Sequence, residues 1–160
     1  MKVIFLDFDG VITTVASHWC LSLEKMQLVK QIVDSTDAKI VISSSWRKYT
    51  LEETIGSITA TGRPFVKQVP FLMPNDVVGV TARMYAFKHG HAESHFRVFR
   101  GVKIKQYLDE HPEIENYVIL DDCSDMLLSQ KDHFIKTDSE KGISKKDVEK
   151  AIKILSADNK

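Results

Sequence analysis

The chain has 160 residues, 43% of them hydrophobic, which suffices for one ordinary core and is short for two, so we expect a single domain over residues 1–160. The 22 basic residues balance 22 acidic ones, which excludes a whole-molecule field for binding polyanions or membrane surfaces. No run reaches the ~18 apolar residues of a membrane span, and Cys20 and Cys123 form no disulfide or metal pattern, so we expect a cytoplasmic protein.

Strand and helix patterns alternate along the chain. A strand is predicted at residues 3–6, a helix with one apolar face at 21–33, and a second strand at 40–42. A shorter helix is predicted at 51–58, followed by a loop-rich segment at 60–100 with a turn at 62–64. A helix at 104–108 then precedes strands at 117–120 and 134–135, and a last helix follows Ser144, where Asp147 completes a capping box.

This alternation predicts an α/β fold, in which a mainly parallel sheet lies between two layers of helices. Three of the predicted strands are each followed directly by polar side chains. These are Asp7 with Asp9, Ser43 with Ser44, and Asp121 with Asp122. Because ligands bind at the carboxyl ends of parallel strands, we expect these three segments to line one crevice.

The segment Asp7-Phe8-Asp9-Gly10 places two carboxylates directly after the first strand, and Gly10 allows the chain to turn sharply away. The same pattern opens calcium-binding loops. Such a loop requires a glutamate at its twelfth position, where this chain has His18, and it follows a helix and not a strand. The pattern therefore favours two carboxylates that act together at the edge of a sheet.

Residues 7–11, 42–44 and 120–122 resemble, in the right order, the first, second and fourth motifs of haloacid dehalogenase (HAD) phosphatases. Ser44-Ser45-Trp46-Arg47, Arg100-Gly101, residues 117–125 and Gly142-Ile143 are similar to the HAD domains of Swiss Army Knife RNA repair proteins. The resemblance spans nearly the whole chain and weakens between 60 and 99. It implies a three-layer, Rossmann-like HAD fold. Since the interval from Asp9 to Ser44 is mostly filled by one helix, we expect a minimal or absent cap.

The resemblance implies a Mg²⁺-dependent phosphohydrolase. In it Asp7 would be the nucleophile that is transiently phosphorylated, and Asp9 the general acid and then base. Asp7, Asp121 and the main-chain carbonyl of Asp9 would hold Mg²⁺, with Asp122 either a further ligand or a partner of one. Ser44 would donate a hydrogen bond to the phosphoryl group. Ser43 is the alternative, and either serine would also suit the cap of a following helix.

The remaining site residues are basic or small. Substrate contacts are expected from Gly10, Ser43, Ser45 and Arg47, although Arg47 would equally suit the carbonyls at a helix end. The third HAD motif requires a basic side chain beside the nucleophile, and Arg100 is preferred, Lys103 is next and Lys105 is also available. Asp125 would support the metal site or lie at the N-terminus of a helix.

The segment 83–105 carries six basic residues against one acidic residue, Glu93, with aromatic residues between them. It would suit a flap that holds a polyanion, or a solvated loop whose aromatic residues fold inward. A flap of this kind, together with the open site expected from a minimal cap, favours a phosphorylated oligonucleotide end or nucleotide as substrate. The alternatives are a phosphatase of small metabolites and a catalytically silent module that binds phosphate or nucleic acid.

Overall fold

The computed structural model describes residues 1–59, 69–83, 85–87 and 95–157, with the backbone alone at 85–87 and 95–97. Five strands form one parallel sheet in the order β3-β2-β1-β6-β7. They are β1 (Lys2–Leu6), β2 (Lys39–Ile42), β3 (Val77–Val80), β6 (Asn116–Asp121) and β7 (Phe134–Lys136). The predicted α/β class with a parallel sheet is confirmed.

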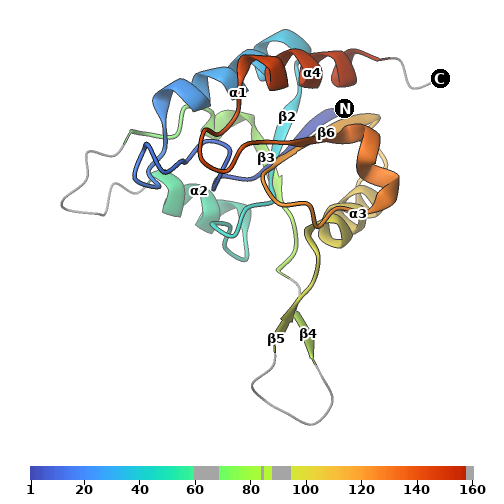
Figure 1. Cartoon of the computed structure of the whole chain (residues 1–160). Helices are drawn as coiled ribbons and strands as arrows, with labels where there is room; N and C mark the ends of the chain where they lie inside the picture. The colour runs from blue at the N-terminus through green and yellow to red at the C-terminus, as the bar shows by residue number, and fades with distance from the viewer. Residues whose placement is uncertain (60–68, 84, 88–94, 158–160) are drawn as a thin grey trace.

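Helices cover both faces of the sheet (Figure 1). They are α1 (Leu23–Thr36), α2 (Leu51–Thr59), α3 (Arg100–Glu110) and α4 (Lys145–Ser156), with short 3-10 turns η1 (Pro74–Asp76) and η2 (Leu128–His133). Helices α1 and α4 lie side by side on one face, and α3 lies on the other. The predicted three layers are thereby present.

The alternation of side chains along β1 explains the two layers. Ile4 and Leu6 belong to the larger apolar cluster, which α1 and α4 cover, whereas Val3 and Phe5 belong to the smaller cluster beneath α3. All four side chains are fully buried. Because β1 is the central strand and is buried on both faces, its apolar sequence fixes the positions of the residues that follow it.

Helix ends follow the local sequence. Ser22 caps α1 by accepting a hydrogen bond from the Lys25 N–H, and α1 ends where Asp37 adopts a left-handed conformation with φ 54°. The predicted capping box of α4 is confirmed, since Ser144 and Asp147 each accept from the other's backbone N–H. Such caps each stabilise a helix by roughly 1 kcal/mol.

The segment predicted to be loop-rich holds three strands, so that prediction was wrong in part. Strand β3 pairs with β2, and β4 (Tyr85–Phe87) pairs antiparallel with β5 (His95–Arg97) in a ribbon that projects from the sheet (Figure 1). In β3, a Cβ at Gly79 would collide with the Tyr107 hydroxyl, so the glycine allows α3 to pack closely. The turn predicted at 62–64 lies outside the described residues.

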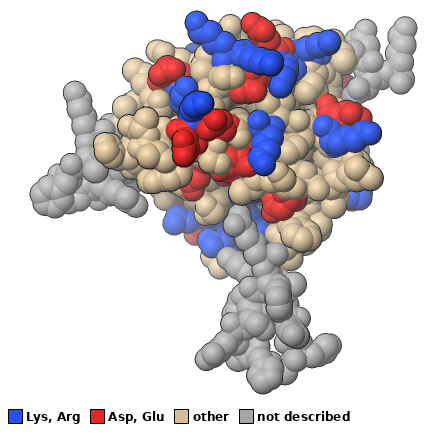
Figure 2. Space-filling model, in the orientation of Figure 1, with Lys and Arg blue, Asp and Glu red and all other residues tan. Residues whose placement is uncertain are grey.

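Between Asp9 and Ser44 the chain forms only turns, α1 and β2, so no cap domain is inserted there, as predicted. None of the helices in the described ranges is both long enough and apolar enough to cross a membrane. Basic and acidic side chains are interspersed on the face shown in Figure 2, in keeping with the balanced charge. Any binding of a polyanion would therefore depend on local contacts.

Candidate active site

Three neighbouring strands deliver polar residues to one edge of the sheet. Asp7 follows β1, Ser43 follows β2, and Asp121 is the last residue of β6. The backbone keeps these ends together, because the Asp7 N–H donates to the Leu120 carbonyl and the Ser43 N–H donates to the Leu6 carbonyl, both at 3.0 Å. All three side chains are buried. The structure therefore brings the polar residues at these strand ends together, as the predicted parallel sheet led us to expect.

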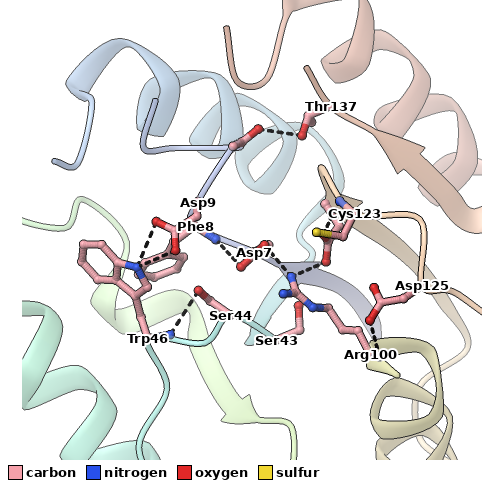
Figure 3. A network of polar contacts seen from close by, with 12 residues as sticks. Asp7, Phe8, Asp9, Ser43, Ser44, Trp46, Arg100, Cys123, Asp125 and Thr137 are labelled. Carbon is pink, nitrogen blue, oxygen red and sulfur yellow. Dashed lines mark hydrogen bonds and ion pairs between the residues drawn. The ribbon is translucent and has the colours of Figure 1, made fainter. Parts of the chain in front are cut away.

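The guanidinium of Arg100 lies between the two central carboxylates (Figure 3). Its Nη1 is 2.5 Å from Asp7 Oδ2 and also contacts Asp121 Oδ2. Arg100 is 5% exposed, so these contacts are shielded from water. Of the three basic candidates, Arg100 is placed against Asp7, whereas its role as the third motif stays a prediction.

Burial controls the protonation of this cluster. Desolvation raises the pKa of Asp7, against the lowering effects of Arg100, of Ser44 and of the Phe8 N–H. Desolvation and then the charge of Asp7 raise the pKa of Asp121 to about 7. Although desolvation acts in the other direction, the charges of Asp7 and Asp121 raise the pKa of Arg100. One guanidinium thus faces two carboxyl groups whose pKa values burial raises.

Arg100 is held at the first turn of α3 by contacts with a distant loop. Its backbone N–H donates to Asp125 Oδ2 at 3.0 Å, and the Gly101 N–H donates to the Asp125 carbonyl at 3.1 Å. A Cβ at Gly101 would collide with the Leu127 backbone N, so this close approach requires glycine. Asp125 therefore satisfies the N-terminus of α3, and it fixes the point from which Arg100 reaches the carboxylates.

The two lysine candidates lie elsewhere on α3. Lys103 is 6% exposed, and it makes contacts within the chain. Lys105 lies on the surface and pairs with Asp109 one turn along the helix, at 2.8 Å. Because that pair is exposed and the carboxylate cluster is buried, Lys105 has the least geometric support of the three candidates.

Asp9 lies next to Asp7 and contacts two side chains. The indole N–H of Trp46 donates to both carboxylate oxygens at 3.1 Å, and the Thr13 hydroxyl donates to Oδ1 at 2.9 Å. Figure 3 shows Trp46 facing Asp9 from the loop after β2. Asp9 therefore lies in a fixed orientation, two residues from the carboxylate that contacts Arg100.

The serines after β2 differ in their contacts. The Ser44 hydroxyl bonds Asp7 and accepts the Trp46 backbone N–H at 3.3 Å, so it lies beside the predicted nucleophile. The Ser43 hydroxyl is buried and has no hydrogen-bond partner among the described residues. Ser45 is exposed. The phosphate contacts predicted for these serines remain predictions.

Arg47 is buried and donates to four carbonyls of its own chain. Nε donates to Thr81 at 2.8 Å, Nη2 to Ala82 at 3.0 Å, and Nη1 to Ser43 at 3.1 Å and Ser44 at 2.5 Å. This is the second of the two roles considered for Arg47, the satisfaction of free carbonyls. The contacts join the loop after β2 to the segment after β3.

The residues present fit a divalent cation. Ligand atoms of Asp121, Asp122 and Cys123 lie within 4.8 Å of one another. Gly10 adopts φ 72°, and a Cβ there would collide with the Asp122 carboxylate, so the glycine lets that carboxylate approach the loop after β1. Partial desolvation and Asp122 raise the pKa of Cys123 to about 11, so Cys123 is a protonated thiol at neutral pH. The carboxylates of Asp121 and Asp122 supply oxygen ligands, which Mg²⁺ prefers.

Sequence reasoning missed Thr13, Thr137 and the contact of Trp46 with Asp9. The Thr137 hydroxyl donates to the Gly10 carbonyl at 2.7 Å, and the Thr137 N–H donates to the Asp121 carbonyl at 3.0 Å. Thr137 thereby ties the loop after β1 to the end of β6. No local pattern marks such residues, although the polar position directly after β7 was a signal that could have been followed.

A comparison with protein families matches residues 3–148 to the HAD domain in Swiss Army Knife RNA repair proteins. No curated protein and no solved structure matches the chain. The matched range contains Asp7, Ser44, Arg100 and Asp121, and it confirms the family resemblance seen in the sequence. In general terms, membership supports a phosphohydrolase of HAD type. The chain belongs to the family of HAD domains in Swiss Army Knife RNA repair proteins.

Proposed function

We propose that this chain is a Mg²⁺-dependent phosphomonoesterase that removes a terminal phosphate from a nucleic-acid end or nucleotide through a phosphorylated Asp7. The observation that supports this most is the buried cluster of Asp7, Asp121 and Arg100 at the carboxyl ends of β1 and β6. A phosphate monoester is anionic, so a carboxylate nucleophile needs positive charge beside it. Arg100 supplies part of that charge.

In the proposed first step, an oxygen of Asp7 forms a bond to phosphorus while the bond from phosphorus to the leaving oxygen breaks. Asp9 gives its proton to the leaving oxygen. In the second step, Asp9 takes a proton from water as the water oxygen attacks phosphorus, and the bond to Asp7 breaks to release phosphate. Division of one displacement into two lower barriers is the advantage of the covalent route.

The chain's own residues orient these groups. The Phe8 N–H donates to Asp7 Oδ1 at 2.8 Å, and Arg100 contacts Oδ2, so both oxygens of the nucleophile have defined positions. In the proposal, Ser44 donates its hydroxyl hydrogen to a phosphoryl oxygen once substrate is bound. Asp7, Asp121, Asp122 and the Asp9 carbonyl would hold Mg²⁺, which supplies charge neutralisation at the phosphoryl oxygens when bound.

An exposed aromatic residue in the segment after Ser44 supports the proposal of a nucleic-acid substrate. Tyr49 is 76% exposed, and the guanidinium carbon of Arg83 lies 5.1 Å from the centre of its ring. Arg47 joins the segments that lead to this pair, because it bonds carbonyls of Ser44 and Ala82. An aromatic face with an arginine beside it suits a base and its phosphate, since base stacking is worth roughly 1–3 kcal/mol. The interval between Asp9 and Ser44 holds no cap domain that would exclude a bulky substrate.

The test is Mg²⁺-dependent phosphate release from 3′- and 5′-phosphorylated oligonucleotides, nucleotides, sugar phosphates and an aryl phosphate. We expect release that requires Mg²⁺, is lost in Asp7→Asn and is fastest with a nucleic-acid or nucleotide substrate. Equal rates on sugar phosphates with none on oligonucleotides would instead support a phosphatase of small metabolites. Metal-dependent binding of oligonucleotide without any release would support a silent binding module.

A further inference from the structure

Trp46 and Thr13 together hold the carboxylate of Asp9, and Figure 3 shows the contact with Trp46. Its indole N–H donates to both Asp9 oxygens at 3.1 Å, whereas the Thr13 hydroxyl donates to Oδ1 alone, at 2.9 Å. Within the part of the chain that the structure describes, Oδ1 therefore accepts two hydrogen bonds and Oδ2 one. An indole N–H donates and has no acceptor capacity, so Trp46 orients Asp9 without exchanging a proton with it.

The indole is itself fixed by packing. The ring centroids of Trp46 and Phe8 are 5.5 Å apart, and Phe8 stacks on Phe71 with ring centroids 5.7 Å apart. Phe8 and Phe71 are buried in the larger apolar cluster, and Trp46 packs against that cluster. A side chain held in this way restricts the rotation of the carboxylate that it contacts.

The same loop reaches both carboxylates that follow β1. The Trp46 backbone N–H donates to Ser44 Oγ at 3.3 Å, and the Ser44 hydroxyl bonds Asp7. Three consecutive residues thus connect Asp7 with Asp9 across a sequence separation of 37 residues between Trp46 and Asp9. A shift of this loop would change the position of one carboxylate relative to the other.

We infer that Trp46 is a positioning residue that aims Asp9 Oδ2 at the leaving oxygen. This inference rests on the proposed function. Oδ2 retains more acceptor capacity than Oδ1, so Oδ2 carries the proton that passes to the leaving oxygen as its bond to phosphorus breaks. The same oxygen then receives a proton from the attacking water. Thr13 holds Oδ1 back from that exchange.

The inference predicts a loss that depends on the leaving group. An alkoxide, such as one from ribose, requires protonation as it leaves, whereas an acidic phenol does not. Trp46→Phe removes the N–H and keeps an aromatic ring against Phe8. We expect a loss of roughly 10- to 100-fold in kcat/KM for an alkyl phosphate and less than about threefold for a nitrophenyl phosphate.

The experiment compares native protein, Trp46→Phe, Asp9→Asn and Trp19→Phe on aryl phosphates of graded phenol acidity and on one alkyl phosphate. Trp19→Phe is the matched control, because Trp19 is half exposed on the turn before α1. We expect kcat/KM of Trp46→Phe to depend more steeply on the acidity of the leaving group than kcat/KM of native protein. Trp19→Phe should show the same dependence as native protein. A loss of equal size on every substrate would overturn the positioning role and indicate a structural defect.

The Asp9→Asn arm separates the two proposals. If Asp9→Asn loses activity on substrates with poor leaving groups and Trp46→Phe is as active as native protein, the role of Trp46 is overturned while Asp9 remains the acid. If both match native protein, the acid role of Asp9 fails, and the inference fails with it. Thr13→Val provides a second variant if Trp46→Phe does not fold, and it should show the same pattern with a smaller loss.

A spectroscopic readout needs no turnover. The chain has two tryptophans, so Trp19→Phe leaves Trp46 as the single indole fluorophore. In that background, Asp9→Ala removes the hydrogen-bond acceptor beside the indole N–H, and the emission of Trp46 should shift. Unchanged emission in a folded protein would show that the contact with Asp9 is absent in solution, which would overturn the inference.

Discussion

Replacement of Arg100 by glutamine should strongly destabilise the Mg²⁺-free protein above neutral pH. The variant leaves Asp7 and Asp121 facing each other, and these side chains are 2% and 0% exposed. Removal of one partner from a buried ion pair typically costs about 3–5 kcal/mol, because an uncompensated buried charge remains. Since a domain of this size has a total stability of about 5–15 kcal/mol, the variant should be marginal and still measurable.

Protonation should rescue this variant. Burial and the charge of Asp7 raise the pKa of Asp121 to about 7 even with Arg100 present. Without the guanidinium, both carboxyl groups should bind protons still more tightly in the folded state than in the unfolded state. The free energy of unfolding should therefore recover at about pH 5, and addition of Mg²⁺ at about pH 8 should restore part of the loss.

The assay is urea unfolding of native protein and Arg100→Gln at about pH 5 and about pH 8, with and without Mg²⁺. Lys105→Gln is a matched control on the same helix, because its pair with Asp109 is exposed and should contribute less than about 1 kcal/mol. A free energy of unfolding for Arg100→Gln within about 1 kcal/mol of that of native protein at about pH 8 would contradict this prediction. It would mean that loss of Arg100 does not leave two buried charges without a partner.

Three further predictions concern the same crevice. Because the pKa values of Asp7 and Asp121 are raised, the folded native protein binds protons more tightly than the unfolded chain, so its Mg²⁺-free stability should fall as pH rises from about 4 to 7. Stabilisation by Mg²⁺, measured by thermal unfolding, should accordingly be larger at about pH 8 than at about pH 5. Asp7→Asn should abolish phosphate release yet leave Mg²⁺-free stability at about pH 8 equal or higher, as calorimetry would show. Tyr49→Ala should raise KM for an oligonucleotide by roughly 5- to 100-fold and leave KM for an aryl phosphate unchanged in steady-state assays.

Each of these has a contradicting result. Mg²⁺ stabilisation that does not depend on pH would show that the titrating groups lie outside the metal site. Residual turnover in Asp7→Asn would transfer the nucleophile's role to another residue. Equal changes in KM for both substrates of Tyr49→Ala would mean that Tyr49 supports the crevice and does not contact the nucleic acid. Tyr49→Phe, which keeps the stacking face, is the control and should resemble native protein.

The main elements of the fold were predictable because their signals are local. The strands at β1, β2 and β6 are short apolar runs, and Asp7, Ser43 and Asp121 lie at their ends. Parallel pairing then brings those ends to one edge without any further information. Strand β3 was missed because Gly79 interrupts a short apolar run. That strand is explained by tertiary contacts, namely pairing with β2 and the packing of Tyr107 over Gly79.

The contacts that organise the candidate site were not predictable in the same way. Asp125 caps α3 from 25 residues away, and Trp46 reaches Asp9 from a separation of 37 residues. Neither contact has a local sequence pattern. Arg47 illustrates the reverse case, since its guanidinium suits either a phosphate or a set of carbonyls. Which of these it meets depends on where the segment after β3 lies.

Trapping of the covalent intermediate would show whether Asp7 becomes phosphorylated. Protein mixed with Mg²⁺ and a turned-over substrate is quenched with acid during turnover, digested and analysed by peptide mass spectrometry. We expect one phosphoryl group on Asp7 in the peptide that contains residues 2–9, and none in Asp7→Asn. A phosphoryl group on another residue, or sustained turnover with Asp7 unmodified at every quench time, would contradict it.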